Sequence, residues 1–168
     1  MQNPKYIVLG VSFSWGRRKG LDVFKKLAED LPPEYRILMV GVDANIRNEL
    51  PPNITTIPRT SSKEEMAEIY TAADVFVNPT REDTFPTVNI ESLACGTPVI
   101  TFCTGGSPEI IDDTCGIAVP VDDYEALKDA IKKTCENGLF SKECCLKRAE
   151  CFNKLMNYRT YVKLYNAV

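Results

Sequence analysis

Histidine is absent from the 168 residues of this sequence. Its absence excludes Ser-His and Cys-His catalysis, and any histidine metal ligand, within the chain itself. No apolar run approaches the roughly 20 residues that a bilayer-spanning helix needs, and residues 1–5 lack the charged-then-apolar pattern of a signal peptide. We therefore expect a cytoplasmic protein without a membrane span.

Motifs for disulfides and metals are also missing. The seven cysteines form no Cys-x-x-Cys pair, so we expect buried free thiols in a reducing compartment and neither a disulfide scaffold nor a zinc site. There is no Asp-x-Asp motif, and the adjacent pairs Asp112-Asp113 and Asp122-Asp123 are interpreted as solvated turns. We therefore expect no metal site.

The sequence lacks a basic excess as well. A net charge of −3 and a pI near 5.1 argue against nucleic-acid binding, which usually requires a basic surface. They leave room for a small basic pocket that binds a phosphorylated ligand. The length is sufficient for one domain with a sizeable core, and no linker or repeat divides the chain. We expect a single domain over residues 1–168.

Short apolar runs alternate along the chain with segments of helical periodicity. Strands are predicted at 6–11, 35–42, 53–57, 74–78, 98–102 and 116–119. Helices are predicted at 21–31, 64–72 after a Ser62/Glu65 capping box, 87–94, within 105–111, from Asp122 or Asp123 to 137–138, 141–156 and 158–167. The alternation predicts an α/β fold, a Rossmann-like parallel sheet with helices on both faces. Because ligands bind at the carboxyl ends of such strands, the loops after Val11, Ile57 and Asn78 are the candidate sites.

Three consecutive cations, Arg17, Arg18 and Lys19, lie between the first predicted strand and the first predicted helix. A helix N-terminus offers free N–H groups and partial positive charge, so the cluster is a candidate phosphate site. The alternative is a solvated basic loop. The segment is not a Gly-x-Gly-x-x-Gly fingerprint, which gives a dinucleotide site little support.

A polar loop joins the fourth predicted strand to a helix. Its residue Asp83 and the helical Glu91 are eight positions apart and could bracket one ligand, since carboxylates accept hydrogen bonds from vicinal sugar hydroxyls. The alternative is that Asp83 or Thr84 only caps the helix and Glu91 is solvated. In the next loop, Gly105 and Gly106 allow close approach to a ligand or simply form a tight turn.

Together these segments resemble the signature of family-four glycosyltransferases. The resemblance is carried by residues 83–91, by the Ala-Cys-Gly-Thr-Pro-Val-Ile run at 94–100 and by the Gly-Gly-Ser-Pro-Glu run at 105–109. It covers the chain from Tyr6 to Tyr165. Family members have the GT-B fold, in which two Rossmann-like domains face each other across a cleft. The chain matches the C-terminal, donor-binding half, so we expect the N-terminal, acceptor-binding domain to be absent from it.

The resemblance assigns roles to residues of this sequence. Glu91 would bind the ribose hydroxyls of a nucleotide, Asp83 would contact the donor sugar, and Lys19 would contact the diphosphate. The backbone N–H groups of Phe85 and Thr87 would face the sugar or the diphosphate. The implied donor-binding set is Gly10, Ser14, Arg18, Lys19, Arg59, Asp83, Thr84, Phe85, Pro86, Thr87 and Glu91, with Lys19 and Asp83 as the catalytic residues.

Two departures from the family pattern affect this assignment. Pro86 stands where the family usually has Gly, which removes one backbone donor. The family arginine has no clean counterpart near Ser14, and Arg18 is the best substitute. Arg59, after the third strand, lies where the family places the nucleobase pocket.

The resemblance implies glycosyl transfer from a nucleotide sugar with retention of configuration, as in polysaccharide biosynthesis. Lys19 and Arg18 would stabilise charge on the departing diphosphate without a metal or other cofactor. The missing domain would bind an acceptor sugar or lipid-linked glycan, which would allow peripheral membrane association of the full-length enzyme, and the isolated chain would be inactive. Three alternatives stay open: a non-catalytic nucleotide-sugar-binding module, half of a sugar-nucleotide epimerase, and a response-regulator receiver, whose acidic cluster is absent here.

Overall fold

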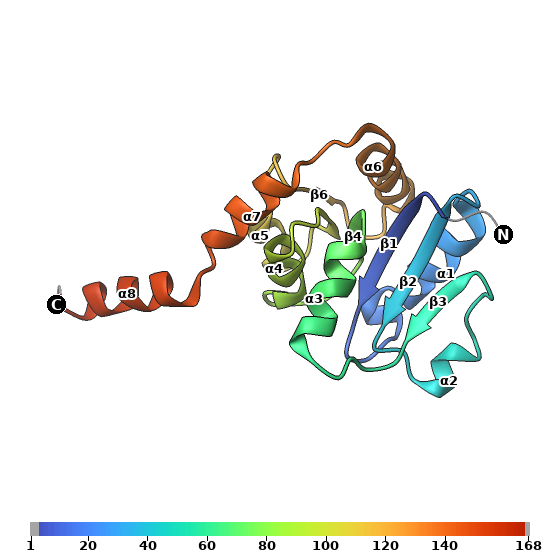
Figure 1. The fold of residues 1–168 in the computed structure, drawn as a ribbon, viewed down its shortest axis with the longest axis horizontal. Helices are drawn as coiled ribbons and strands as arrows, with labels where there is room; N and C mark the ends of the chain where they lie inside the picture. Colours follow the sequence, from blue (N-terminus) through green and yellow to red (C-terminus); the bar gives the residue numbers. More distant parts are fainter. Residues whose placement is uncertain (1–3, 167–168) are drawn as a thin grey trace.

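The computed structural model of the chain describes residues 4–166 and contains a six-stranded, fully parallel sheet (Figure 1). The strand order is β3-β2-β1-β4-β5-β6. The strands are β1 Tyr6–Val11, β2 Tyr35–Val40, β3 Ile54–Ile57, β4 Val75–Asn78, β5 Val99–Phe102 and β6 Gly116–Val119. The predicted Rossmann-like sheet is confirmed, and β1 and β4 lie side by side at its centre.

Helices cover both faces of the sheet, as predicted. The α-helices are α1 Leu21–Asp30, α2 Ala44–Arg47, α3 Lys63–Ala72, α4 Thr87–Ala94, α5 Ser107–Ile110, α6 Tyr124–Asn137, α7 Lys142–Glu150 and α8 Lys154–Tyr165, and a short 3₁₀ helix η1 spans Arg17–Lys19. Buried residues of α1 and α6 pack on one face. Those of α3, α4, α5 and α7 pack on the other.

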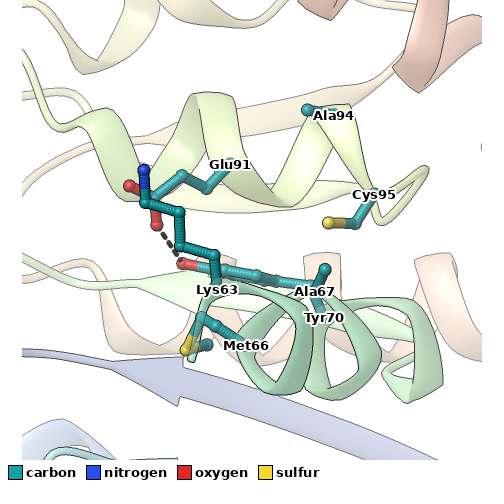
Figure 2. Close-up of a pocket in the computed structure, with 7 residues that line it drawn as sticks. All are labelled: Lys63, Met66, Ala67, Tyr70, Glu91, Ala94 and Cys95. Atoms are coloured by element: carbon teal, nitrogen blue, oxygen red, sulfur yellow. Dashed lines mark hydrogen bonds between the residues drawn. The ribbon is translucent and has the colours of Figure 1, made fainter. Parts of the chain in front are cut away.

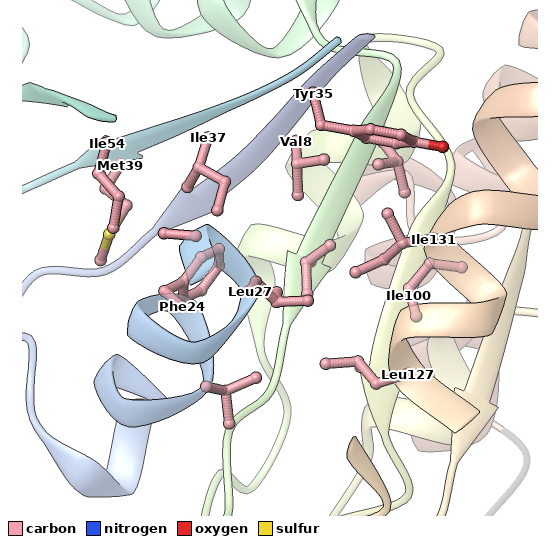
Figure 3. Packing of buried hydrophobic residues seen from close by; sticks show 14 of the residues in the cluster. Val8, Phe24, Leu27, Tyr35, Ile37, Met39, Ile54, Ile100, Leu127 and Ile131 are labelled. Carbon is pink, nitrogen blue, oxygen red and sulfur yellow. The ribbon is translucent and has the colours of Figure 1, made fainter. Parts of the chain in front are cut away.

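The core beneath α1 and α6 follows from the alternation of side chains along the strands (Figure 3). Phe24 and Leu27 of α1 are fully buried against Val8, whereas the next strand residue, Leu9, belongs to the core on the opposite face. Because both faces are covered, every position of β4 and β5 is buried. Full burial of one such apolar side chain contributes about 1.5–3 kcal/mol.

The second strand ends two residues before its predicted end. Gly41 turns the chain with φ +81, and a Cβ at this position would lie 1.8 Å from the carbonyl oxygen of Ser12. The strand therefore stops at Val40, and the loop after β2 lies against the loop after β1. The short helix α2, begun by the side chain of Asp43 that accepts bonds from Asn45 N and Ile46 N, was not predicted.

The last two helices are divided at a different place from the predicted one. The predicted helix over 141–156 ends at Glu150, and α8 begins at Lys154. Asn153 Oδ1 accepts a bond from Leu155 N at 2.9 Å, so this residue starts a new helix. α8 projects away from the sheet (Figure 1) and exposes Tyr158, Tyr161 and Tyr165.

The ends of the chain limit two of the predictions. The predicted helix end at residue 167 and the outermost residues of the predicted 1–168 domain lie outside the described residues. Among residues 4–166, no helix has the length and apolar character needed to cross a bilayer.

Candidate functional site

A groove opens where β1 and β4 end, between the loops that follow these two strands. Its volume is about 410 Å³. We call it the β1–β4 groove, and it is lined by Val11, Ser12, Phe13, Ser14, Arg18, Lys19, Asn78, Asp83, Phe85, Pro86, Thr87 and Val88. Its place at the carboxyl ends of central parallel strands is the one where α/β sheets bind ligands.

Lys19 and Asp83 meet in this groove. Lys19 Nζ lies 2.6 Å from Asp83 Oδ2, and the two side chains are only 21% and 19% exposed. Sixty-four positions separate them along the chain, and the parallel pairing of β1 with β4 brings their loops together. The groove therefore holds a cation suited to phosphate and a carboxylate suited to hydroxyl groups.

The cation cluster lies on a tight turn that precedes α1. Residues Arg17–Lys19 form η1, and Gly20 ends it with φ +77, at a place where a Cβ would lie 2.5 Å from Pro79 Cγ. Arg18 and Ser14 are exposed residues of the groove lining. The guanidinium of Arg18 also donates to the carbonyl of Glu82 at 3.4 Å. The predicted cluster thus faces the loop that carries Asp83.

The glycine pair at 105–106 supports the Asp83 loop from behind. Gly105 has φ +48, and a Cβ there would lie 1.7 Å from the carbonyl oxygen of Asp83. Gly106 N donates to Thr84 O at 2.8 Å. The two glycines therefore permit close approach of backbone to backbone and fix the exposed Thr84 in the loop.

The loop residues of this segment do not cap α4. Pro86 is the residue before the helix, and no side chain accepts a bond at this helix start. The alternative in which Asp83 or Thr84 caps the helix is therefore wrong. Phe85 and Thr87 lie exposed on either side of the buried Pro86, and all three line the groove.

A second hollow continues from the β1–β4 groove past the end of β1. This Arg59 hollow, of about 290 Å³, shares Val11, Ser12, Phe13 and Val88 with the groove. The guanidinium carbon of Arg59 lies 4.2 Å from the ring centroid of Phe13, which is 80% exposed. The two side chains form a flat, partly cationic wall of the kind that stacks on planar groups.

Glu91 lies on a third hollow, between α3 and α4 (Figure 2). This α3–α4 pocket, of about 410 Å³, is lined by Lys63, Met66, Ala67, Tyr70, Glu91, Ala94 and Cys95. Glu91 is exposed, and its Oε2 accepts a hydrogen bond from the Tyr70 hydroxyl at 3.3 Å. Burial, together with the Glu91 charge, raises the pKa of Tyr70, so this hydroxyl stays a donor. The amine of Lys63 points toward Glu91 in Figure 2.

The structure separates Gly10 from the other predicted site residues. Gly10 is buried within β1, where a Cβ would lie 2.4 Å from Phe24 Cζ. It lines none of the three hollows described above. Its small size allows α1 to pack closely on the sheet.

The adjacent aspartates at 122–123 lie in an exposed turn, as predicted, and each also makes a specific bond. Asp123 starts α6 by accepting a bond from Ala126 N at 3.0 Å. Asp122 instead pairs with Arg81, with 2.6 Å between Nη2 and Oδ1. Sequence reasoning missed Arg81, which carries no local motif. Asp112 does form a turn of its own, by accepting bonds from the backbone N and the hydroxyl of Thr114.

All seven cysteines are free thiols, and their burial differs. Cys115 and Cys145 are buried, and burial raises their pKa values to about 11 and about 12. Cys103 and Cys151 are exposed, so the expectation that the thiols are buried holds for only part of the set. Among residues 4–166, no three cysteine or acidic side chains gather as a potential metal site.

Comparisons with known proteins point to one family. The profile described as Glycosyl transferases group 1 matches residues 4–137. A D-inositol 3-phosphate glycosyltransferase of Mycobacteroides abscessus is 32% identical over 127 residues, which make up 67% of this chain and 28% of that protein. A sulfoquinovosyl transferase of Arabidopsis thaliana is 32% identical over 102 residues, or 58% of this chain and 20% of that protein.

Solved structures share the fold. Sucrose-phosphate synthase from Thermosynechococcus elongatus has a TM-score of 0.78 and 30% identity, covering 97% of this chain and 46% of that one. HepE of Anabaena, solved in complex with UDP-glucose, has a TM-score of 0.79 over 97% of this chain and 49% of that one, and at 15% identity this likeness supports the fold alone. The chain spans less than half the length of each of these relatives.

Proposed function

Because the chain belongs to the group 1 glycosyl transferases, we propose that it supplies the donor site for transfer of a sugar from a nucleotide sugar, with retention of configuration. The observation that carries this proposal is the Lys19–Asp83 pair, in which both charged groups face one groove at the ends of β1 and β4. One group suits a diphosphate and the other suits sugar hydroxyls.

The three hollows suggest how a donor would lie. Its diphosphate would lie by Lys19 and Arg18, where the backbone N–H of Thr87 at the start of α4 adds partial positive charge. The sugar would reach Asp83, and the ribose would reach Glu91, whose carboxylate is oriented by Tyr70. The base would then stack against the Arg59–Phe13 wall.

Lys19 would stabilise the leaving group as the bond between the sugar and the diphosphate breaks. Negative charge grows on the departing diphosphate, and a cation held in place beforehand stabilises that charge without reorganisation. In our proposal Lys19 and Arg18 perform this neutralisation and a metal does not. A diphosphate would compete with Asp83 for Lys19, which would leave the carboxylate free to accept bonds from the donor sugar.

The acceptor belongs to the part of the enzyme that this chain does not contain. Since the chain spans less than half the length of its relatives, we propose that a second domain binds an acceptor sugar or lipid-linked glycan, near a membrane surface where the acceptor is lipid-linked. The chain alone would then bind a nucleotide and not catalyse transfer.

Calorimetric titration of the chain with UDP, GDP, ADP and dTDP tests the donor site. We expect weak binding, with UDP preferred over GDP, because only one side of the cleft is present. Glu91→Ala should weaken UDP binding by roughly 1.5–3 kcal/mol through loss of a charged hydrogen bond to ribose, while circular dichroism reports an intact fold. Absence of heat with all four nucleotides at millimolar concentration would contradict the proposal.

A further inference from the structure

Arg81 lies in the loop after β4 and bonds to the segments that follow β1 and β6. It does not line the β1–β4 groove. Its guanidinium makes a two-pronged ion pair with Asp22 of α1, with both nitrogen-to-oxygen distances at 2.9 Å. The other edge donates from Nε to Asp122 Oδ1, in the loop after β6, at 2.7 Å. Nη1 also donates to the carbonyl of Arg17 in η1. One side chain from the loop after β4 thus bonds to the segments that follow β1 and β6.

The backbone of Arg81 extends this connection to the neighbouring residue of η1. Arg81 N donates to Arg18 O at 2.9 Å, and the hydroxyl of Thr80 also approaches Arg18 O, at 3.4 Å. On the other side, the hydroxyl of Thr104 donates to Arg81 O at 3.2 Å. Carbonyls of both Arg17 and Arg18 are therefore held by the segment that carries Asp83.

Asp122 presents its carboxylate to Arg81 from a left-handed turn. Asp122 has φ +65, and within residues 4–166 it is the one non-glycine residue with positive φ, a conformation that Asp tolerates better than most residues. The Arg81 side chain is only 19% exposed and that of Asp122 is 54% exposed, so the arginine side of this ion pair is the shielded one.

We infer that Arg81 is a positioning residue for the diphosphate subsite, because it fixes the η1 turn and with it the distance of Arg18 and Lys19 from Asp83. The inference rests on the proposed function, since it gives the groove a diphosphate to bind. It follows from the contact pattern: the guanidinium is fully engaged with Asp22, Asp122 and Arg17 O, so it acts through the turn and not on the ligand. Small misplacements of positioned groups have large effects on binding and rate.

The location of these contacts predicts which part of a ligand depends on them. Arg81 bonds to the turn that carries Arg18 and Lys19. Arg59 is instead placed against Phe13, and Glu91 accepts a bond from Tyr70. Loss of Arg81 should therefore weaken binding of the diphosphate and spare binding of the nucleoside. A general loss of stability would weaken both together.

The test compares UDP, UMP and uridine on the 168-residue chain by calorimetry or ligand-observed NMR. For Arg81→Gln we expect UDP affinity to fall at least about tenfold and uridine affinity to change less than about twofold. Asp22→Asn and Asp122→Asn each remove one ion pair. Each should lower UDP affinity by a smaller factor than Arg81→Gln does, and should again lower it more than uridine affinity. The matched control is Glu49→Gln, which removes the exposed Lys25–Glu49 ion pair, also formed by α1, and should leave the affinities for all three ligands unchanged.

The outcomes separate this inference from the proposed function. If the wild-type chain binds none of the three ligands, the proposed function fails. If the wild type binds UDP and Arg81→Gln either keeps UDP affinity or loses uridine affinity equally, the positioning role is overturned. If Arg81→Gln does not fold, Asp22→Asn and Asp122→Asn replace it in the test. A lower ratio of UDP affinity to uridine affinity than in the wild type supports the positioning role, and an unchanged ratio overturns it.

Discussion

At the scale of single residues, Lys19 and Asp83 neutralise each other within the β1–β4 groove. A diphosphate therefore has to compete with Asp83 for the ammonium group. Asp83→Asn removes the competing charge and keeps the shape of the side chain. We expect this variant to bind UDP about threefold more tightly, and to lose the additional affinity of UDP-glucose over UDP, since an amide accepts fewer hydroxyl bonds than a carboxylate.

Parallel titrations of UDP and UDP-glucose measure both effects. Lys19→Met is the complementary variant and should weaken UDP binding by roughly 1.5–3 kcal/mol, because a charge-assisted bond to phosphate is lost. An unchanged ratio of UDP-glucose affinity to UDP affinity in Asp83→Asn would contradict the assignment of Asp83 to the sugar.

Local sequence patterns singled out some of the residues that line the groove. The cation run at 17–19 and the Asp83–Glu91 spacing pointed to Lys19 and Asp83, and the pairing of β1 with β4 brings their loops together. Arg81 could not be found this way, because its partners Asp22 and Asp122 are 59 and 41 positions distant. Gly10 entered the predicted set by resemblance, and the structure gives it a packing contact with Phe24 instead.

At the scale of elements, the loop before α4 takes its shape from the glycine pair in the loop before α5. Gly105→Ala places a methyl group where the carbonyl of Asp83 lies, so we expect the Asp83 loop to move and UDP-glucose binding to weaken at least about tenfold. Gly138→Ala is the matched control. Gly138 also has positive φ, +57, but nothing lies within 4 Å of the position that a Cβ would take there.

Gly138→Ala should lose roughly 1–2 kcal/mol of unfolding free energy, because it forces an L-residue into the left-handed region. Gly105→Ala should lose more, because its methyl group also meets the backbone carbonyl of Asp83. Only Gly105→Ala should also lose ligand affinity. Urea denaturation and calorimetry measure the two quantities separately. Equal ligand affinity in the two variants would show that the Asp83 loop does not depend on Gly105.

Elements with long apolar patterns were predicted well, and the errors lie at turns. β2 was predicted to continue to Val42, but the left-handed backbone of Gly41 ends it at Val40. At the break between α7 and α8, the side chain of Asn153 accepts a bond from Leu155 N. The helical propensity of the residues on either side hides this break in the sequence. α2 has four residues and no apolar periodicity to reveal it.

At the scale of the whole molecule, buried thiols report on global unfolding. Burial raises the pKa of Cys115 to about 11 and that of Cys145 to about 12, so at pH 8 both remain protonated as well as shielded. We expect the exposed Cys103 and Cys151 to react with iodoacetamide at once, and Cys115 and Cys145 to react only as the fold opens. Mass spectrometry of timed samples measures the order.

Urea should accelerate labelling of the two buried thiols together, because Cys115 and Cys145 belong to one core between the sheet and α7. Early labelling of Cys145 alone would mean instead that α7 opens independently of the sheet.

The separation of Lys19 from Asp83 by 64 positions also sets an order of events during synthesis. β1 and β2 are consecutive and can pair as soon as both have left the ribosome, whereas β4 must close a long loop before it joins β1. At roughly 5–20 residues per second, several seconds pass between the appearance of the lysine and that of the aspartate. A ligand of this groove stabilises only chains in which both are present, by mass action on the completed domain. Nascent chains that stop short of residue 83 therefore gain nothing from it and depend on their hydrophobic core alone.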